Sequence, residues 1–249
     1  MRINKISKCL RFLFLFVALL FCFSGHAKTL VPTYKIVKTK HGVPVYFFPT
    51  TKVPLFQVEL AFRGGSDFDP DQYSGLSYLA SSLVKRGTDT LDENAISIKF
   101  DDLASGVNIS VNEDWTTVST YGLNDKAKDI LDLTFQILSH PSLSEKTFRR
   151  LKQNHIEHIQ KLPESAGYLA SYVFDLLLFN GTQKARPSTG LIGDLNRIQL
   201  ADIKKFYPNL LRRDRLAVLV IGGINESEVL QRVVNKLEEL PCRKCKKPE

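Results

Sequence analysis

The sequence predicts an α+β fold in which a mainly antiparallel sheet is covered by helices. Alternating apolar and polar residues near the N-terminus are typical of strands, and apolar residues spaced three and four apart further along are typical of helices. The order of these segments is neither a strict strand–helix alternation nor an all-strand pattern. With 249 residues, 43% of them apolar, the chain has enough material for one sizeable core.

Extended segments open the predicted fold. Strands are expected over 34–39 and 43–48, on either side of a short turn at 40–42 that contains a glycine. A third strand is expected over 55–62, because apolar side chains occupy every second position there. We expect these three strands to form a small antiparallel sheet.

Helices dominate the rest of the chain. The segment 75–85 places Leu76, Leu79, Ala80 and Leu83 on one helical face, with polar residues opposite. The same reasoning predicts further helices over 92–104, 126–138, 144–162, 165–179, 199–206 and 226–240. Strands are expected over 107–112, 116–121 and 216–221.

The N-terminus has the pattern of a secretory signal peptide. Four basic residues precede the apolar run 12–23, and small residues stand before a cleavage point after Ala27. Twelve apolar residues are too few for a transmembrane helix, which needs about twenty. We therefore expect residues 1–27 to be removed, a secreted and periplasmic protein with no stable membrane anchor, and a folded domain over 28–240.

The charge and cysteine content exclude other classes of protein. The formal net charge is +8, but cleavage after Ala27 leaves 30 basic against 26 acidic side chains, and no basic stripe remains for nucleic acid. Cys242 and Cys245 lie in the basic tail 241–249, where they could close a small disulfide loop or play no role.

Two side-chain patterns could carry chemistry. Ser82 and Lys85 form a Ser-x-x-Lys pair, but the other signatures of acyl-serine enzymes are absent, and both fall on the polar face of their helix. His155, Glu157 and His158 share a second helix. At about 100° per residue the two histidines flank its apolar stripe and Glu157 points away, so the three do not converge on one metal ion.

The stretch FRGGSDFDPDQYSGLSYLASSLVKRGT, residues 62–88, resembles the core of the pitrilysin, insulinase and mitochondrial processing peptidase family. In active members a helix carrying Gly-small-His-x-x-Glu-His is followed by a Gly-Thr pair, and here Gly75, Gly87 and Thr88 match. The resemblance extends over about 34–240, and it implies the fold of the first α+β domain of a family half-molecule.

The resemblance also implies that the zinc site of that family is lost. The motif that supplies two histidine ligands and a general base reads Tyr78, Ser81 and Ser82 here, and the position of the distal glutamate ligand falls near His158. Hydroxyl groups are poor zinc ligands. We therefore expect no catalytic residue, no metal and no other cofactor.

These expectations predict a catalytically inactive homologue of a zinc peptidase. In the family, active and degenerate halves pair around a substrate chamber, so the resemblance implies an active relative or a second homologous domain as partner, and peptide or unfolded polypeptide as ligand. One alternative is a zinc metalloendopeptidase with a site rearranged around His155, Glu157 and His158 or completed by a partner. Another is a decayed gene product without function.

Overall fold

A computed structural model describes residues 32–39, 42–50, 52–223 and 226–240. The described residues from Tyr34 onward belong to one compact unit, Tyr34–Glu249. The expected signal peptide, most of the turn at 40–42 and the tail with Cys242 and Cys245 lie outside the described residues.

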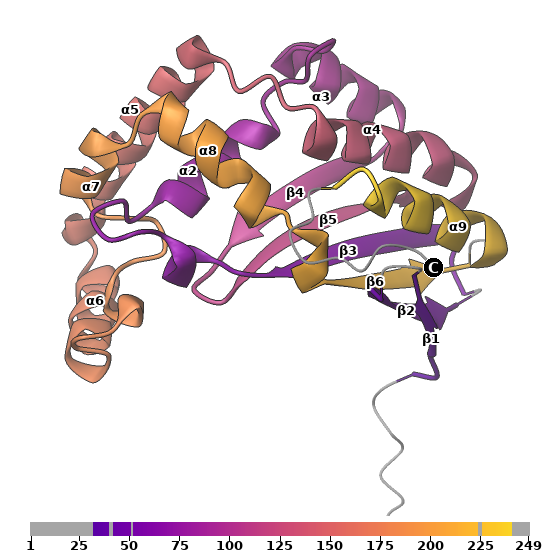
Figure 1. The fold of residues 1–249 in the computed structure, drawn as a ribbon, viewed down its shortest axis with the longest axis horizontal. Helices are drawn as coiled ribbons and strands as arrows, with labels where there is room; N and C mark the ends of the chain where they lie inside the picture. The colour runs from indigo at the N-terminus through magenta and orange to yellow at the C-terminus, as the bar shows by residue number, and fades with distance from the viewer. Residues whose placement is uncertain (1–31, 40–41, 51, 224–225, 241–249) are drawn as a thin grey trace, which may run out of the picture. The chain divides into compact units, whose positions relative to one another are not determined.

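Six strands form one mixed sheet, in the order β1-β2-β6-β3-β5-β4 (Figure 1). The strands are β1 (Lys35–Lys38), β2 (Pro44–Pro49), β3 (Leu55–Arg63), β4 (Gly106–Val111), β5 (Trp115–Leu123) and β6 (Leu216–Gly222). All neighbours are antiparallel except β2 and β6, which are parallel. The expected α+β fold with a mainly antiparallel sheet is confirmed, but the expected three-stranded sheet is wrong, because β6 lies between β2 and β3.

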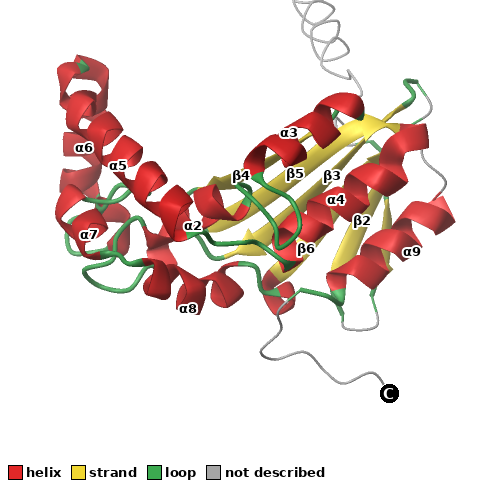
Figure 2. Cartoon of the chain, turned by 90° about the horizontal axis from the view of Figure 1, so that it is seen from above, coloured by secondary structure: helices red, strands yellow, loops and turns green. Residues whose placement is uncertain are grey.

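The sheet has one covered and one open face. On β3 the buried residues alternate with more exposed ones, and Phe56, Val58, Leu60 and Phe62 all face the core. Three helices lie across this covered face, α3 (Glu93–Asp102), α4 (Ala127–Ser139) and α9 (Glu226–Leu237) (Figure 2). The alternation along the strands thus sets which side of the sheet receives helices.

The other helices gather at one end of the sheet (Figure 2). They are α2 (Leu76–Val84), α5 (Glu145–Lys161), α6 (Ala166–Leu178), α7 (Ile192–Arg197) and α8 (Leu200–Leu210). The helix α7 is too short for its periodicity to be recognised in the sequence. The helix α8 continues past Pro208, which lies in its last turn. Within the described residues no helix is both long and apolar enough to cross a bilayer.

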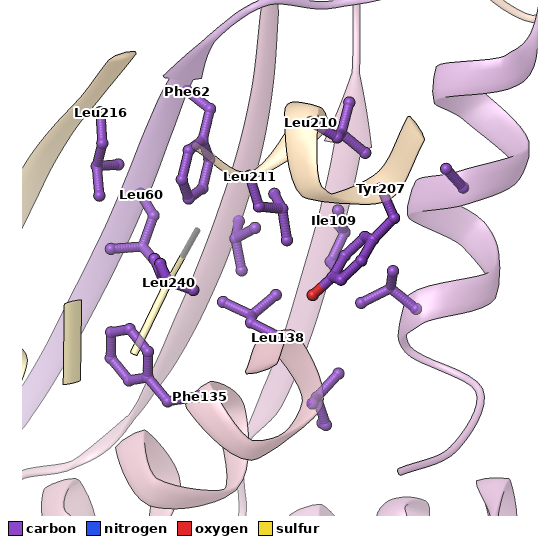
Figure 3. Close-up of a cluster of buried hydrophobic side chains, with 14 of the residues drawn as sticks. Leu60, Phe62, Ile109, Phe135, Leu138, Tyr207, Leu210, Leu211, Leu216 and Leu240 are labelled. Carbon is purple, nitrogen blue, oxygen red and sulfur yellow. The ribbon is translucent and has the colours of Figure 1, made fainter. Parts of the chain in front are cut away.

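The main core fills the space between the covered face of the sheet and the helices (Figure 3). It contains side chains from strands, from α4, from α8 and from the segments that follow α8 and α9, labelled in Figure 3 as Leu60, Phe62, Ile109, Phe135, Leu138, Tyr207, Leu210, Leu211, Leu216 and Leu240. The hydroxyl of Tyr207 has no hydrogen-bond partner among the described residues, and burial raises its pKa. An unpaired buried hydroxyl costs free energy of about 1–3 kcal/mol, so Tyr207 is a weak point of this core.

The glycines that follow β3 allow a close approach of two backbones. A Cβ on Gly65 would lie 1.9 Å from the carbonyl oxygen of Asn112, and the neighbouring amide of Ser66 donates to that same oxygen at 2.9 Å. Only glycine fits in such a contact. The turn after β3 is therefore held against the β4–β5 hairpin and directs the chain toward α2.

Candidate functional site

A buried carboxylate holds the start of α2. The Oδ2 atom of Asp69 accepts from the backbone amide of Gly75 at 2.8 Å, and Oδ1 accepts from the amide of Ser77 at 2.9 Å and from its hydroxyl. These bonds satisfy amides that have no partner within the helix. Burial raises the pKa of Asp69 to about 6, and the hydrogen bonds from Ser77 and Gly75 oppose this rise.

A second contact joins the start of α2 to the loop before α7. Gly75 has φ +94°, and a Cβ there would lie 2.7 Å from Leu195 and 2.9 Å from the carbonyl oxygen of Thr189. The amide of Ser74 donates to Asp194 Oδ2 at 3.3 Å. Because only glycine tolerates this conformation and this proximity, Gly75 brings α2 into direct contact with the Thr189 loop.

Tyr78 and His155 form the centre of the candidate site. Their rings stack with centroids 4.1 Å apart and an interplanar angle of 20°, which joins α2 to α5. His155 is buried, and its Nε2 lies 2.7 Å from the carbonyl oxygen of Thr189. Since a carbonyl oxygen only accepts, Nε2 must carry the hydrogen. The nitrogen nearest the loop is therefore a donor and has no lone pair for a metal.

The environment of His155 favours its neutral form. Burial lowers the pKa of the imidazole, the hydrogen bond to Thr189 acts in the opposite direction, and nearby His158 lowers the pKa further. A neutral ring also stacks on Tyr78 without burying a charge. The arrangement is that of a packed aromatic pair at neutral pH.

The other two motif positions, Ser81 and Ser82, also offer no metal ligand. Ser81 is buried, and its hydroxyl donates to the carbonyl oxygen of Tyr78 at 2.9 Å. Ser82 is half-buried on the same helix. Within the described residues no hydrogen bond joins Ser82 to Lys85, whose pKa is lowered by burial and by Arg86, so the Ser-x-x-Lys pair is not assembled.

The structure separates the three residues of the proposed rearranged metal site. His155 is buried, whereas His158 and Glu157 are exposed, and Glu157 accepts a hydrogen bond from Gln153 at 2.8 Å. His158, near which the resemblance places the family's distal ligand, is therefore exposed, and His155 is the residue of α5 that contacts Tyr78. The helical angles of the two histidines alone could not distinguish them, because the Thr189 loop decides which one is covered.

The part of the chain that contains the candidate site matches a known protein family. The model of the insulinase family, peptidase family M16, matches residues 50–194, which include all of α2 and α5. The match covers more than half of the chain. The chain belongs to peptidase family M16.

Relatives of the chain include a non-peptidase homolog and a probable peptidase subunit. The chain is 22% identical over 228 residues to the non-peptidase homolog YmxG of Helicobacter pylori, an alignment that covers 92% of this chain and 52% of that protein. It is also 22% identical over 205 residues to a probable β subunit of the mitochondrial-processing peptidase of Arabidopsis thaliana, covering 81% and 38% of the two chains.

A solved structure of the family has the same fold. The inactive M16 peptidase domain from Pseudomonas fluorescens superposes with a TM-score of 0.78 at 21% identity, covering 87% of this chain and 54% of that one. The chain thus spans about half the length of the M16 proteins it matches.

The donor set at the position that the sequence resemblance assigns to the metal does not fit zinc. Tyr78, Ser81 and Ser82 offer neutral hydroxyl groups, and the imidazole that faces them already donates to Thr189. A catalytic zinc needs three ligands of histidine, cysteine or carboxylate type and an open position for water. Within the described residues no group of three or more such side chains could hold a metal ion.

The pKa of His155 predicts a pH-dependent stability. Because the folded state binds its proton less tightly than the unfolded chain, the contribution of His155 is complete above pH 6.5 and is lost as the pH falls below it. The variant His155→Phe keeps an aromatic ring but loses the hydrogen bond. We expect it to be about 1–2 kcal/mol less stable than the unaltered chain at neutral pH, and the difference to shrink on acidification.

Urea unfolding at several pH values measures the free energy of unfolding of the unaltered chain and of His155→Phe. The titration of Asp69 also changes stability with pH, but it cancels in the difference because both proteins contain Asp69. His158→Gln is the matched control, since His158 is exposed on the same helix. We expect this substitution to change the free energy of unfolding by no more than about 0.5 kcal/mol at any pH. A stability gap between His155→Phe and the unaltered chain that stays constant from neutral to acidic pH would contradict the assignment.

Proposed function

We propose that this chain is a secreted, non-catalytic member of peptidase family M16 that binds polypeptide and acts as a partner of an active relative. The observation that carries the proposal is the Tyr78–His155 stack, which occupies the place where the family's motif would bring zinc ligands together. The fold around that place is retained, so selection for a binding surface explains the chain better than decay does. The similarity to a non-peptidase homolog and to an inactive domain supports the same function.

Secretion is part of the proposal. It rests on the basic residues, the apolar run 12–23 and the small residues before the cut after Ala27. In a Gram-negative cell this signal leads to the periplasm, where the domain 28–240 would fold after transport.

A homologous M16 domain is the proposed partner, and the open face of the sheet is the surface proposed to bind it. This face carries the exposed side chains Tyr34, Ile36, Leu55, Trp115, Tyr121 and Leu123. The strand register places Leu55, Tyr121 and Leu123 together, since Leu55 pairs with Leu123 and Gln57 with Tyr121, and it places Trp115 on the same side at the opposite end of β5. An exposed apolar patch of this kind marks an interaction site, and the matched proteins have about as much chain again with which to cover it.

Polypeptide binding has a precedent among the structural neighbours. A mutant of the ferredoxin protease FusC, 16% identical to this chain with a TM-score of 0.73, was solved in complex with Arabidopsis ferredoxin. The alignment covers 87% of this chain and 25% of that one. We propose that the fold keeps the capacity to hold a polypeptide here, without the metal that would cleave it.

Metal content tests the loss of catalysis. After expression with ample zinc and dialysis without chelator, elemental analysis should find well below one zinc per chain, because hydroxyl donors bind zinc weakly. We also expect no cleavage of unstructured peptides. A ratio near one that falls on replacing His155 or His158, but not Cys242 or Cys245, would show a relocated metal site and refute the proposal.

A positive control shows that the assay can detect metal at this place. The combined variant Tyr78→His, Ser81→Glu, Ser82→His and His155→Glu restores the donor types on the two facing helices. It should bind more zinc than the unaltered chain while keeping the same circular dichroism spectrum.

The mass of the secreted protein tests the signal peptide. When the full gene is expressed in a Gram-negative host, intact-mass spectrometry of the periplasmic fraction should give a chain that begins at Lys28. The variant Ala27→Arg should block cleavage, because the signal peptidase requires a small residue there. Recovery of the full-length chain from the cytosol would exclude secretion.

Co-purification tests the partner. Co-expression with an M16 peptidase that has the His-x-x-Glu-His motif, taken from the same genome, should give a stable complex. Tyr121→Glu places a charge on the open face, where Tyr121 is 57% exposed, and should weaken the complex at least tenfold. Ile98→Glu is the matched control, because Ile98 is 59% exposed on α3, over the other face. If the two substitutions weakened the complex equally, the open face would not be the surface that binds the relative.

A further inference from the structure

The helix α6 presents its apolar side to solvent. None of its thirteen residues is buried, and it follows α5 along the chain and lies away from the sheet (Figure 2). The large apolar side chains are between 38% and 77% exposed: Leu169, Val173, Phe174, Leu176, Leu177 and Leu178. Moving each of these side chains out of water would lower the free energy of the system. The apolar side of α6 is therefore suited to a partner surface that the described residues do not supply.

The orientation of α6 is the reverse of an ordinary surface helix. At about 100° per residue, the apolar side chains together with Ala166 and Ala170 span about half of the helix circumference. The half-buried residues of α6, Tyr168 and Tyr172, lie on the opposite side, where their rings stack with centroids 6.0 Å apart. The helix therefore turns its tyrosines toward its own chain and its leucines away from it.

The charge of α6 distinguishes between possible partners. Asp175 is its one charged residue, and the helix carries no lysine or arginine. Helices that lie on anionic membranes have basic residues along the polar face. The composition therefore favours a protein surface over a lipid surface.

We propose that α6 pairs in an antiparallel manner with α6 of a second copy of this chain. Ala166, Ala170, Val173 and Leu177 are spaced by four, three and four residues, which is the spacing of the a and d positions of a coiled coil. These four residues lie along the centre of the apolar side. They form the seam of the proposed interface.

The sizes of the seam residues select the antiparallel arrangement. Small residues occupy the N-terminal half of the seam and large ones the C-terminal half. A two-fold axis between Ala170 and Val173 places Ala166 against Leu177 of the second copy, and Ala170 against Val173 of the second copy. Each layer then joins a small side chain to a large one, as close packing requires. Parallel pairing would place alanine against alanine and leave a gap.

The available area predicts a reversible dimer. The exposed apolar side chains of α6 offer on the order of 500 Å² per copy, against about 800 Å² per partner in a standard stable interface. The interface is thus at the lower end for specific complexes. Self-association should depend on protein concentration.

Self-association through α6 is separate from the proposed function, because α6 is not part of the open face of the sheet. Either proposal can fail without the other. The two are distinguished by their variants, since Tyr121→Glu should leave the α6 dimer intact and an α6 substitution should leave binding to the active relative intact.

Sedimentation velocity over a hundredfold range of concentration tests the dimer. The purified chain should shift from monomer to dimer and go no further. Leu177→Glu puts a charge on the seam at a leucine that is 77% exposed and should weaken the dimer at least tenfold. Ser171→Glu is the matched control, because it adds the same charge to an exposed position of α6 outside the seam. The dissociation constant of its dimer should stay within about twofold of that of the unaltered chain.

The register has its own test. In the antiparallel arrangement the double variant Ala166→Lys, Leu177→Glu brings lysine and glutamate together twice, so it should recover the association that Leu177→Glu loses. In a parallel pair the like charges would face each other and the loss would deepen. Circular dichroism of each variant verifies that α6 is still formed.

Four outcomes would overturn the proposal. They are a monomer at every concentration, a dimer that Leu177→Glu leaves unchanged, growth beyond a dimer into open aggregates, and an α6 face that binds only an M16 relative or vesicles of phosphatidylcholine. Each is visible in the same sedimentation experiment, with the relative or the vesicles added.

Discussion

The carboxylate of Asp69 determines where the candidate site lies. A helix begins with amides that have no partner within it, and at the start of α2 these amides point into the protein. Asp69 satisfies two of them from the preceding turn, with the hydroxyl of Ser77 as a third donor. The cost is a buried acid whose pKa rises to about 6. Without this contact the amides of Gly75 and Ser77 would be buried without partners, which would destabilise the first turn of α2 directly before Tyr78.

The Tyr78–His155 stack performs one of the two tasks of a metal site. In an active relative the zinc ion would both activate water and join the two helices that ligate it. Here the joining is achieved by ring contact and by the hydrogen bond from His155 to Thr189, which also ties in the loop before α7. These contacts keep α2 and α5 connected although the hydroxyl groups of Tyr78, Ser81 and Ser82 do not fit zinc. The fold therefore does not need a metal ion to join the two helices.

Local patterns in the sequence were sufficient for most elements and insufficient for their arrangement. The apolar spacing of Leu76, Leu79 and Leu83 predicts α2 to within a residue at each end. Periodicity predicts an end at Phe206 and does not reveal that α8 continues through Pro208, because proline usually ends a helix near its own position. It also does not separate His155 from His158, because the Thr189 loop, 34 residues away, covers one of them. The capping role of Asp69 likewise depends on a turn that no pattern announces.

The position of β6 affects how the chain can fold. This strand, close to the end of the described residues, lies between β2 and β3. The strands β2 and β3 come early in the chain, but they cannot join one sheet until residues 216–222 pair with both of them. Pairings between residues so distant in sequence are slow to form. A chain that emerges from the N-terminus onward therefore stays unfinished until nearly all of it is available, with the edges of β2 and β3 unpaired in the meantime. Such a delay is compatible with the proposed secretion, because a secreted chain is moved before it folds.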